Sequence, residues 1–599
     1  MKISKTNLKN FSNCESYPAL YNIKRDKLRA FEETIGIPLE EIYEILGNIF
    51  DPESGEDLTA IDTTQLEAMA EKYKDVEELA IKFCEDVFQT KIKASRNINE
   101  QEKVEYFKDG HTFYTYLDGF KETDNEFLIF EVKATTNSEF LKLEGKVGLD
   151  KIPYFNKEGN FLVPNEHHER MWETEKKLLD RYSDTGKYFF DIAITDYLFK
   201  HSNLFINNKK KKVRSYLVIL NSDYVYDGVS KGYPELNGEK LFNIIDTTYI
   251  IEDYDIEEEI NKTIKYINEA NTDCIVSKKC RRKKTDCCPM VNYCWKEPGA
   301  DGSIFEYLYN HFGFKRGKEK AISTFDLYYQ YKYFKMVDVP DELLNRPINK
   351  VQKACALNNE EYINIKNIKT VLGKLRYPLY HLDFESFNDP LPRFRGENPY
   401  SQSVFQYSLH IEKEPGDKNV LKNHTQYIAK GFGDERYELV KQLVNDIKIT
   451  DKKGMVVVYN KAFEESRLKE FIVLFPEFEE KLQLMIDNMV DLLKILNSDS
   501  YMSGSIDQSR GGSMFNYYNV DLHGSFSIKK VLPVFSDLSY KDLAVKNGME
   551  AILAYSKFEH GTKEEIEDIR NNLAIYCGQD TYSMVVILNK LWERVRKGK

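Results

Sequence analysis

The sequence lacks any apolar run of the length that a membrane-spanning helix needs, which is about 20 residues. Its first 18 residues also lack the apolar core of a secretory signal, so we expect a cytoplasmic protein without a membrane span. An excess of basic charge is absent as well, because the formal net charge is −12. This excludes a protein that coats nucleic acid nonspecifically, since such a protein is basic overall. An enzyme acting on nucleic acid is compatible with this charge, because acidic metal sites add negative charge.

The length of the chain, 599 residues, exceeds what one hydrophobic core supports and predicts two or three domains. Residues 1–300 mix helical patterns with strand-like runs, and residues 301–370 are mostly helical and rich in tyrosine. From residue 371 onward, strand-like runs come first and helical patterns follow. We therefore predict an α/β fold with one domain at 1–300, a helical connector at 301–370 and a second domain at 371–599.

Two carboxylates stand close together in the apolar stretch YPLYHLDFESFND, residues 377–389. Asp383 and Glu385 share one face of a strand, because side chains alternate along it. Further along, Glu464 opens a helix after a strand-like run, and Tyr576 lies four residues before Asp580 on a shared helix face. Carboxylate oxygens suit Mg²⁺ or Mn²⁺, and two such ions about 3.5–4 Å apart can cleave a phosphodiester. The alternative is that these acids are local caps and surface groups.

Residues 377–590 resemble the DEDD superfamily of 3′–5′ exonucleases, which have a ribonuclease-H-like fold. The resemblance implies that the first motif is filled by Asp383 and Glu385, the second by Glu464 and the third by Asp580. These four residues would hold the metal ions.

The third motif of that superfamily carries either a His or a Tyr, and this chain matches the Tyr form. The His form needs histidine five residues before Asp580, where this chain has Ile575, whereas Tyr576 fits the Tyr form. Tyr576 would then orient the attacking water. Glu464 departs from the pattern, because the second motif usually carries Asp. The segment GSFSIKKVLP, residues 524–533, resembles the stretch between the second and third motifs.

A second set of charged residues lies in the amino-terminal half. Asp118 precedes a strand-like run that delivers Glu131 and Lys133 to one strand face. Two carboxylates can bind a divalent ion, and a lysine beside them can position water or stabilise charge. The alternative is an exposed strand with alternating charges. The set resembles the PD-(D/E)XK nuclease fold of RecB-type proteins, although Asp191 and Thr195 stand where that family has Gln and Tyr.

Five of the nine cysteines fall within 21 residues, between Cys274 and Cys294. In a cytoplasmic chain such a cluster indicates metal ligation rather than disulfides. RecB-like nucleases of the CRISPR-associated and AddB types hold an iron–sulfur cluster with one early and three late cysteines. That resemblance implies a 4Fe-4S cluster on Cys14, Cys280, Cys288 and Cys294, with Cys274 a rival for Cys280 and Cys287 for Cys288. Four thiolates also suit zinc.

A basic run accompanies the cysteines, and its members Lys278, Lys279, Arg281 and Arg282 are predicted phosphate contacts. The alternative is a solvated loop. The whole chain resembles a bacterial family that joins a RecB-like front half to a DEDD-type back half. We therefore expect a metal-dependent nuclease on DNA that cuts from a 3′ end, with the front half offering a candidate second nuclease site. By analogy, its role would be in DNA repair, DNA processing or defence against foreign DNA. The alternatives are an RNA exonuclease and a catalytically inactive nucleic-acid-binding scaffold.

Overall fold

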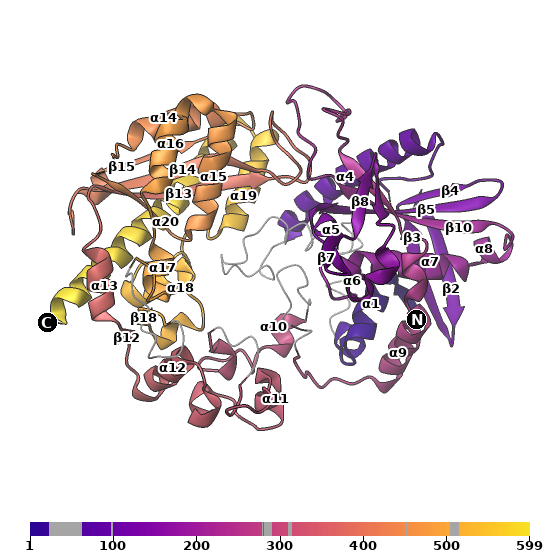
Figure 1. Ribbon diagram of the computed structural model, residues 1–599, viewed down its shortest axis with the longest axis horizontal. Coiled ribbons are helices and arrows are strands. Elements are labelled where there is room, and N and C mark those ends of the chain that lie inside the picture. The colour runs from indigo at the N-terminus through magenta and orange to yellow at the C-terminus, as the bar shows by residue number, and fades with distance from the viewer. Residues whose placement is uncertain are drawn as a thin grey trace.

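The computed structural model describes residues 1–22, 63–97, 100–277, 280, 290–308, 314–450, 452–502 and 514–598. Figure 1 shows two bodies, one indigo to purple from the amino-terminal half and one orange to yellow from the carboxy-terminal half. Each body combines helices with a sheet, so the mixed α/β class predicted from the sequence is confirmed. None of the described helices combines the length and the apolarity that crossing a bilayer requires.

The amino-terminal body is built on a sheet of six described strands. In pairing order these are β4 (Gly119–Glu122), β5 (Glu126–Thr136), β10 (Lys212–Leu220), β11 (Phe242–Asp246), β9 (Phe161–Pro164) and β8 (Phe155–Glu158). β5 is buried along its whole length except at its two ends, as expected for a strand covered on both faces. α4 (Thr63–Phe88) packs on one face and α7 (Gly186–Lys200) on the other.

The start of the chain is held firmly against this body. β1 (Lys2–Ser4) pairs in parallel with β3 (His111–Leu117), and α1 (Lys5–Asn13) follows it at once and contacts both α7 and α9 (Ile256–Glu269). Among the described residues this body also contains β2 (Glu102–Lys108), α5 (Ser138–Leu141), β6 (Glu144–Val147), β7 (Asp150–Pro153), α6 (Trp172–Leu178) and α8 (Asn203–Ile206).

Residues 301–370, the predicted connector, divide between two hydrophobic cores. Its first part, with α11 (Thr324–Tyr329), forms a small cluster of its own around Leu327 and Met336. α12 (Pro347–Asn358) and α13 (Ile365–Leu372) instead pack into the core of the carboxy-terminal body. β12 (Tyr362–Ile363) pairs with β18 (Tyr517–Tyr518) of that body.

The carboxy-terminal body has a sheet of five described strands. They pair in the order β15 (His424–Ile428), β14 (Gln402–Glu412), β13 (Leu379–Asn388), β16 (Met455–Val458) and β17 (Met489–Asp491). β14 is antiparallel to both β13 and β15, whereas β16 is parallel to β13 and β17. β13, which carries Asp383 and Glu385, is therefore the central strand.

Helices cover both faces of this second sheet. One face is covered by α14 (Arg436–Asp446), α15 (Lys461–Leu474) and α16 (Glu479–Asp487). The long α20 (Lys563–Lys597), yellow in Figure 1, crosses β13 and β14 on the other face. The same body contains α17 (Leu492–Asn497), α18 (Ile528–Phe535) and α19 (Gly548–Ser556).

The two bodies share one hydrophobic core. Val132 of β5 and Val218 of β10 belong to the same buried cluster as Phe387 of β13 and Tyr555 of α19. The loop after β13 strengthens the contact, because Tyr226 and the 396–397 backbone exchange two hydrogen bonds of 2.8 Å each. The strand that carries the candidate carboxylates is thus anchored to the amino-terminal body.

Candidate active site

The central strand β13 presents its two carboxylates to α20. Phe384 between them faces the opposite side of the sheet, where its ring meets Phe471 of α15 edge-on with centroids 6.0 Å apart. On the α20 side, the Cys577 thiol lies 3.4 Å from Asp383 Oδ2. Alternation along the strand therefore places Asp383 and Glu385 together, as the sequence predicts.

Glu464 enters from the first turn of α15. This helix begins directly after β16, and Asn460 at the junction has a left-handed backbone with φ of +68°. Asp491 at the end of β17 accepts hydrogen bonds from the backbone N–H groups of Asn460 and Lys461 at 3.3 and 3.2 Å, which fixes the start of the helix. Glu464 is 2% exposed, and its Oε2 has no hydrogen-bond partner among the described residues. A buried carboxylate oxygen of this kind requires a cation or a donor.

Ionisation of Asp383 and Glu464 is unfavourable in the absence of a cation. Burial, and then the charge of Asp580, raise the pKa of Asp383 well above its ordinary value, with Lys529 opposing them. Burial, and then Asp383, likewise raise the pKa of Glu464. Like charges in a low-dielectric site penalise each other's ionisation, and a divalent cation between them would remove that penalty. The oxygen donors fit Mg²⁺ or Mn²⁺.

A tyrosine that the sequence patterns did not reveal completes the environment of Asp580. The Tyr540 hydroxyl donates to Asp580 Oδ1 at 2.7 Å, and its ring meets that of Tyr576 edge-on at 6.2 Å. Tyr540 lies in a segment without helical or strand periodicity, so no local signal marks it. Lys529 Nζ lies 5.8 Å from the centroid of the Tyr576 ring, and this lysine is part of GSFSIKKVLP, which did stand out in the sequence.

Cys577 is a further neighbour that sequence reasoning passed over. Burial, and then the charges of Asp383 and Glu385, raise the pKa of its thiol well above the ordinary value, so the thiol donates to Asp383. One ligand atom each from Asp383, Glu385 and Cys577 lie within 4.8 Å of one another. Its position beside Tyr576 was the signal that could have found it.

Removal of divalent ions should expose the repulsion among these acids as a pH dependence of stability. The folded-state pKa of Asp383 is raised, so its contribution to stability is complete below the ordinary pKa of 3.8 and is lost as pH rises through the folded value. In EDTA, we expect Asp383→Asn to raise the melting temperature near neutral pH by roughly 1–3 °C. Differential scanning fluorimetry across about pH 4 to 8 checks this expectation.

Asp487→Asn is the matched control for that experiment, because Asp487 is exposed on α16 and far from β13 in sequence. Its melting curve should follow the wild type at every pH. Added Mn²⁺ should stabilise the wild type and the control, since only a folded site binds the ion. It should not stabilise Asp383→Asn, because that variant lacks one of the carboxylates that would hold the ion. A melting temperature that falls in Asp383→Asn without metal would contradict the picture of mutual repulsion.

The amino-terminal set has the opposite electrostatic character. Glu131 is 1% exposed, and its Oε1 lies 2.6 Å from Lys5 Nζ and 3.1 Å from Lys133 Nζ. Its Oε2 accepts from the Thr195 hydroxyl at 3.1 Å. Asp118 Oδ2 accepts from the backbone N–H of Val132 at 2.9 Å. The structure therefore brings Asp118, Glu131 and Lys133 together, but side chains of the protein already engage both oxygens of Glu131.

Asp191 extends the same network. Its carboxylate lies 2.8 Å from Lys133 Nζ and 2.6 Å from Lys9 Nζ. Burial disfavours ionisation of Asp191 and Glu131, but the lysines outweigh burial and lower the pKa of both carboxyls. Lysine side chains already balance the negative charge of Glu131 and Asp191. In this arrangement the two carboxylates do not fit a divalent ion.

The early and late cysteines approach each other in space. Burial raises the pKa of Cys14, and the nearby Cys280 and Cys274 raise it further. The Ser16 hydroxyl donates to the carbonyl of Asp273 at 2.5 Å, which holds the two segments together. Cys294 lies on α10 (Val291–Cys294). Outside the described residues lie Cys287, Cys288 and the basic residues Lys278, Lys279, Arg281 and Arg282, so the cluster and the phosphate contacts stay predictions.

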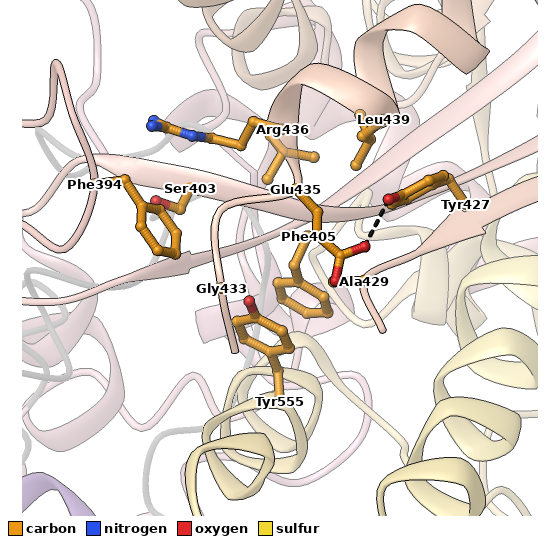
Figure 2. A pocket seen from close by; sticks show the side chains of 11 residues that line it. Phe394, Ser403, Phe405, Tyr427, Ala429, Gly433, Glu435, Arg436, Leu439 and Tyr555 are labelled. Atoms are coloured by element: carbon orange, nitrogen blue, oxygen red, sulfur yellow. Dashed lines mark hydrogen bonds between the residues drawn. The ribbon is translucent and has the colours of Figure 1, made fainter. Parts of the chain in front are cut away.

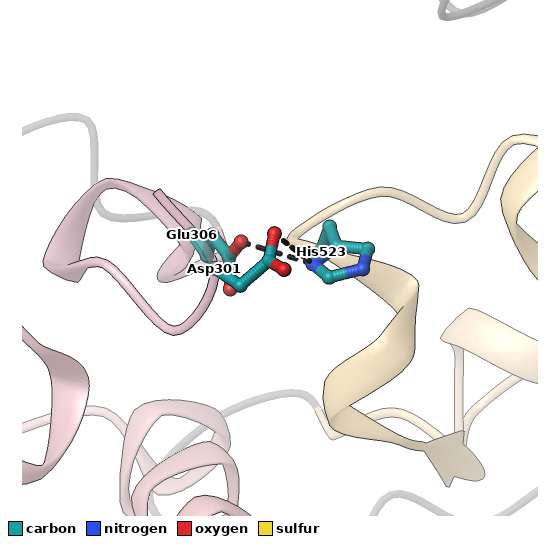
Figure 3. A group of neighbouring side chains, drawn as sticks. All are labelled: Asp301, Glu306 and His523. Carbon is teal, nitrogen blue, oxygen red and sulfur yellow. Dashed lines mark hydrogen bonds and ion pairs between the residues drawn. The ribbon is translucent and has the colours of Figure 1, made fainter. Parts of the chain in front are cut away.

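Figure 3 shows another cluster, at the junction between the connector and the carboxy-terminal body. His523 Nδ1 lies 3.2 Å from Glu306 Oε1 and 3.5 Å from Asp301 Oδ1. The Asp301 side chain is 90% exposed, so only the contact with Glu306 is well sheltered. This contact joins two segments of the chain through a hydrogen bond between His523 and Glu306.

A pocket lies elsewhere on the carboxy-terminal body, between β14, β15, α14 and α19 (Figure 2). Phe405 and Tyr555 stack inside it with centroids 4.1 Å apart, and the Tyr427 hydroxyl donates to Glu435 Oε2 at 2.7 Å. None of the candidate carboxylates lines it, so the pocket is separate from the site.

Comparison with known proteins identifies relatives without assigning a function. Residues 380–527 match the family described as a domain of unknown function, DUF2779. The match contains Asp383, Glu385 and Glu464 and ends before α20. An uncharacterized protein of Mycoplasma genitalium is 25% identical over 320 residues, covering 49% of this chain and 45% of the relative.

Two further relatives are also uncharacterized proteins. An uncharacterized protein of Ureaplasma parvum is 28% identical over 233 residues, covering 36% of this chain and 31% of the relative. An uncharacterized protein of Mycoplasma pneumoniae is 26% identical over 249 residues, covering 39% of this chain and 35% of the relative. The chain thus spans less than half the length of each of these relatives. No solved structure matches.

Proposed function

We propose that the chain is a metal-dependent nuclease that removes nucleotides from the 3′ end of DNA at the carboxylates of its carboxy-terminal body. The observation that carries the proposal is the convergence of Asp383, Glu464 and Asp580 from a central strand and two separate helices. Burial and mutual repulsion raise the pKa of Asp383 and Glu464. Proteins retain such a costly arrangement mainly at functional sites.

The fold of the carboxy-terminal body supports this proposal. A mixed sheet with helices on both faces and the first acidic pair on its central strand is compatible with a ribonuclease-H-like exonuclease domain. The RecB-like assignment of the amino-terminal body rests on Asp118, Glu131 and Lys133 meeting on and beside β5. We assign catalysis to the carboxy-terminal site, because lysines already neutralise the amino-terminal acids.

Each residue of the site has a role in this proposal. Asp383, Glu385, Glu464 and Asp580 would hold Mg²⁺ or Mn²⁺, which when bound would activate water and stabilise the leaving oxygen. The Tyr576 hydroxyl would orient the water that attacks phosphorus, and the bond to the 3′ oxygen breaks to release a nucleoside 5′-monophosphate. Tyr540 holds Asp580 in place through its 2.7 Å hydrogen bond. Lys529 supplies positive charge beside Tyr576 for a phosphate.

Matched DNA and RNA strands of one sequence, labelled at the 5′ end, test the substrate. With Mn²⁺ we expect the DNA strand to shorten at least about tenfold faster than the RNA strand, a difference of about 1.4 kcal/mol in the barrier. Faster decay of RNA would replace DNA by RNA as the substrate class. Binding of both strands without any shortening would favour the inactive scaffold.

A further inference from the structure

Cys577 occupies an unusual position for a thiol. It lies on α20 between Tyr576 and Asp580, is fully buried, and its Sγ is 3.4 Å from Asp383 Oδ2. Ligand atoms of Asp383, Glu385 and Cys577 gather within 4.8 Å of one another. Two of the three atoms are hard oxygens, and the third is a soft sulfur.

The distance between sulfur and oxygen is compatible with two ligands of one ion. Metal–sulfur bonds are about 2.3 Å and metal–oxygen bonds about 2.0–2.2 Å in zinc sites. At coordination angles between a right angle and the tetrahedral angle, these bond lengths place sulfur and oxygen roughly 3.1–3.7 Å apart. The observed 3.4 Å separation falls in that interval.

A second observation concerns Glu464, whose ionisation is disfavoured by burial and then by the charge of Asp383. Glu464 Oε2 is buried without a hydrogen-bond partner among the described residues, although Glu464 is only 2% exposed. The charge of Asp383 acts directly on Glu464. The thiol contacts Asp383, and Asp383 in turn acts on a buried carboxylate that requires a cation or a donor.

We propose that Cys577 is a ligand of the metal ion held by Asp383 and Glu385, and that it shifts the preference of the site from Mg²⁺ toward softer divalent ions such as Co²⁺ and Zn²⁺. This rests on the proposed function only in naming the site as a metal centre. On binding, the S–H bond gives way to a sulfur–metal bond and the proton passes to water. No change in the oxidation state of sulfur or metal is involved. Thiolate ligands favour such ions, whereas Mg²⁺ demands oxygen.

Titration with Co²⁺ tests the assignment by a spectroscopic signature. A cobalt–thiolate bond gives a charge-transfer band in the near ultraviolet, which a hydrogen-bonding role of Cys577 would not produce. We expect Cys577→Ser to lose part of the band seen in the wild type and to bind Co²⁺ at least about tenfold more weakly. The matched control is Cys355→Ser, because Cys355 is also buried but lies in α12. The amino-terminal cysteines contribute equally to all three proteins.

Asp383→Asn provides a second route if Cys577→Ser fails to fold. An ion shared by both side chains predicts that this variant also loses part of the cobalt–thiolate band. Unchanged bands and Co²⁺ affinities in the folded variants would overturn the assignment and leave Cys577 as a hydrogen-bond donor to Asp383.

DNA cleavage is measured separately, so the two proposals can fail independently. Cleavage that depends on Asp383, without a band that depends on Cys577, would refute the thiolate ligand and retain the nuclease. A band that depends on both residues, without cleavage of any strand, would retain the ligand and refute the nuclease.

Discussion

Asp383→Asn is expected to slow DNA hydrolysis at least about 10³-fold, which corresponds to about 4 kcal/mol of lost transition-state stabilisation. The variant keeps the size of the side chain and the strand that carries it, but it removes one negative charge from the centre of the site. A metal ion that depends on this charge would be lost or displaced, and with it the activation of water. Single-turnover assays at saturating Mn²⁺ measure the chemical step rather than product release.

Two further variants are compared with Asp383→Asn, one as a control and one as a second test of the site. Asp487→Asn on the exposed end of α16 changes the same chemical group away from the site and should keep wild-type turnover. Glu464→Gln should lose activity as severely as Asp383→Asn, because it removes the negative charge that α15 brings to the site. Full activity in Glu464→Gln would place the ion away from α15 and would remove Glu464 from the site.

Lys133→Met is expected to cost about 3–5 kcal/mol of folding free energy, the typical cost of breaking a buried ion pair. Lys133 is 1% exposed and lies 2.8 Å from a carboxylate oxygen of Asp191 and 3.1 Å from one of Glu131. Without this lysine, two buried carboxylates share less positive charge. Urea unfolding followed by intrinsic fluorescence, with protein of equal concentration, measures the change.

The control for Lys133→Met is Lys103→Met on β2. Lys103 also pairs with an acid two residues away, Glu105, at 2.6 Å, but both side chains are partly exposed. Exposed pairs contribute about 0–1 kcal/mol, so this variant should unfold almost as the wild type does. If the two substitutions lowered the free energy of unfolding equally, the ion pairs around Glu131 would be solvated and would not stabilise the amino-terminal body.

The same network has a pH dependence opposite in sign to that of the carboxy-terminal acids. The folded-state pKa values of Glu131 and Asp191 are lowered, so their stabilisation is present above the ordinary pKa values of 4.5 and 3.8 and is lost as pH falls. In Lys133→Met, stability should fall less steeply as pH decreases, because the lysine that helps to lower the pKa of Glu131 and Asp191 is absent.

Local sequence patterns were sufficient for part of the site. The period of two along a strand places Asp383 and Glu385 on one face and Phe384 on the other, which the contact of Phe384 with Phe471 confirms. The period of a helix places Tyr576 and Asp580 on one face of α20. The mixed α/β class was also predicted correctly, since it follows from alternating strand and helix patterns.

Other parts depend on contacts that no local pattern encodes. Lys5 meets Glu131 across 126 residues of sequence, and the shared core joins β5 to β13 and α19. Tyr540 reaches Asp580 from an irregular segment. These partners are selected by tertiary packing, so their roles became visible only in the folded chain.

We propose that the carboxy-terminal acids serve to hydrolyse DNA from its 3′ end. The most direct measurement follows a 5′-labelled DNA strand with Mn²⁺, with either a free or a blocked 3′ end, in wild type and Asp383→Asn. In the wild type we expect a ladder that shortens one nucleotide at a time from the free 3′ end and protection by the block, and in the variant we expect an intact strand. Cleavage that persists in folded Asp383→Asn, or that ignores the 3′ block, would contradict it.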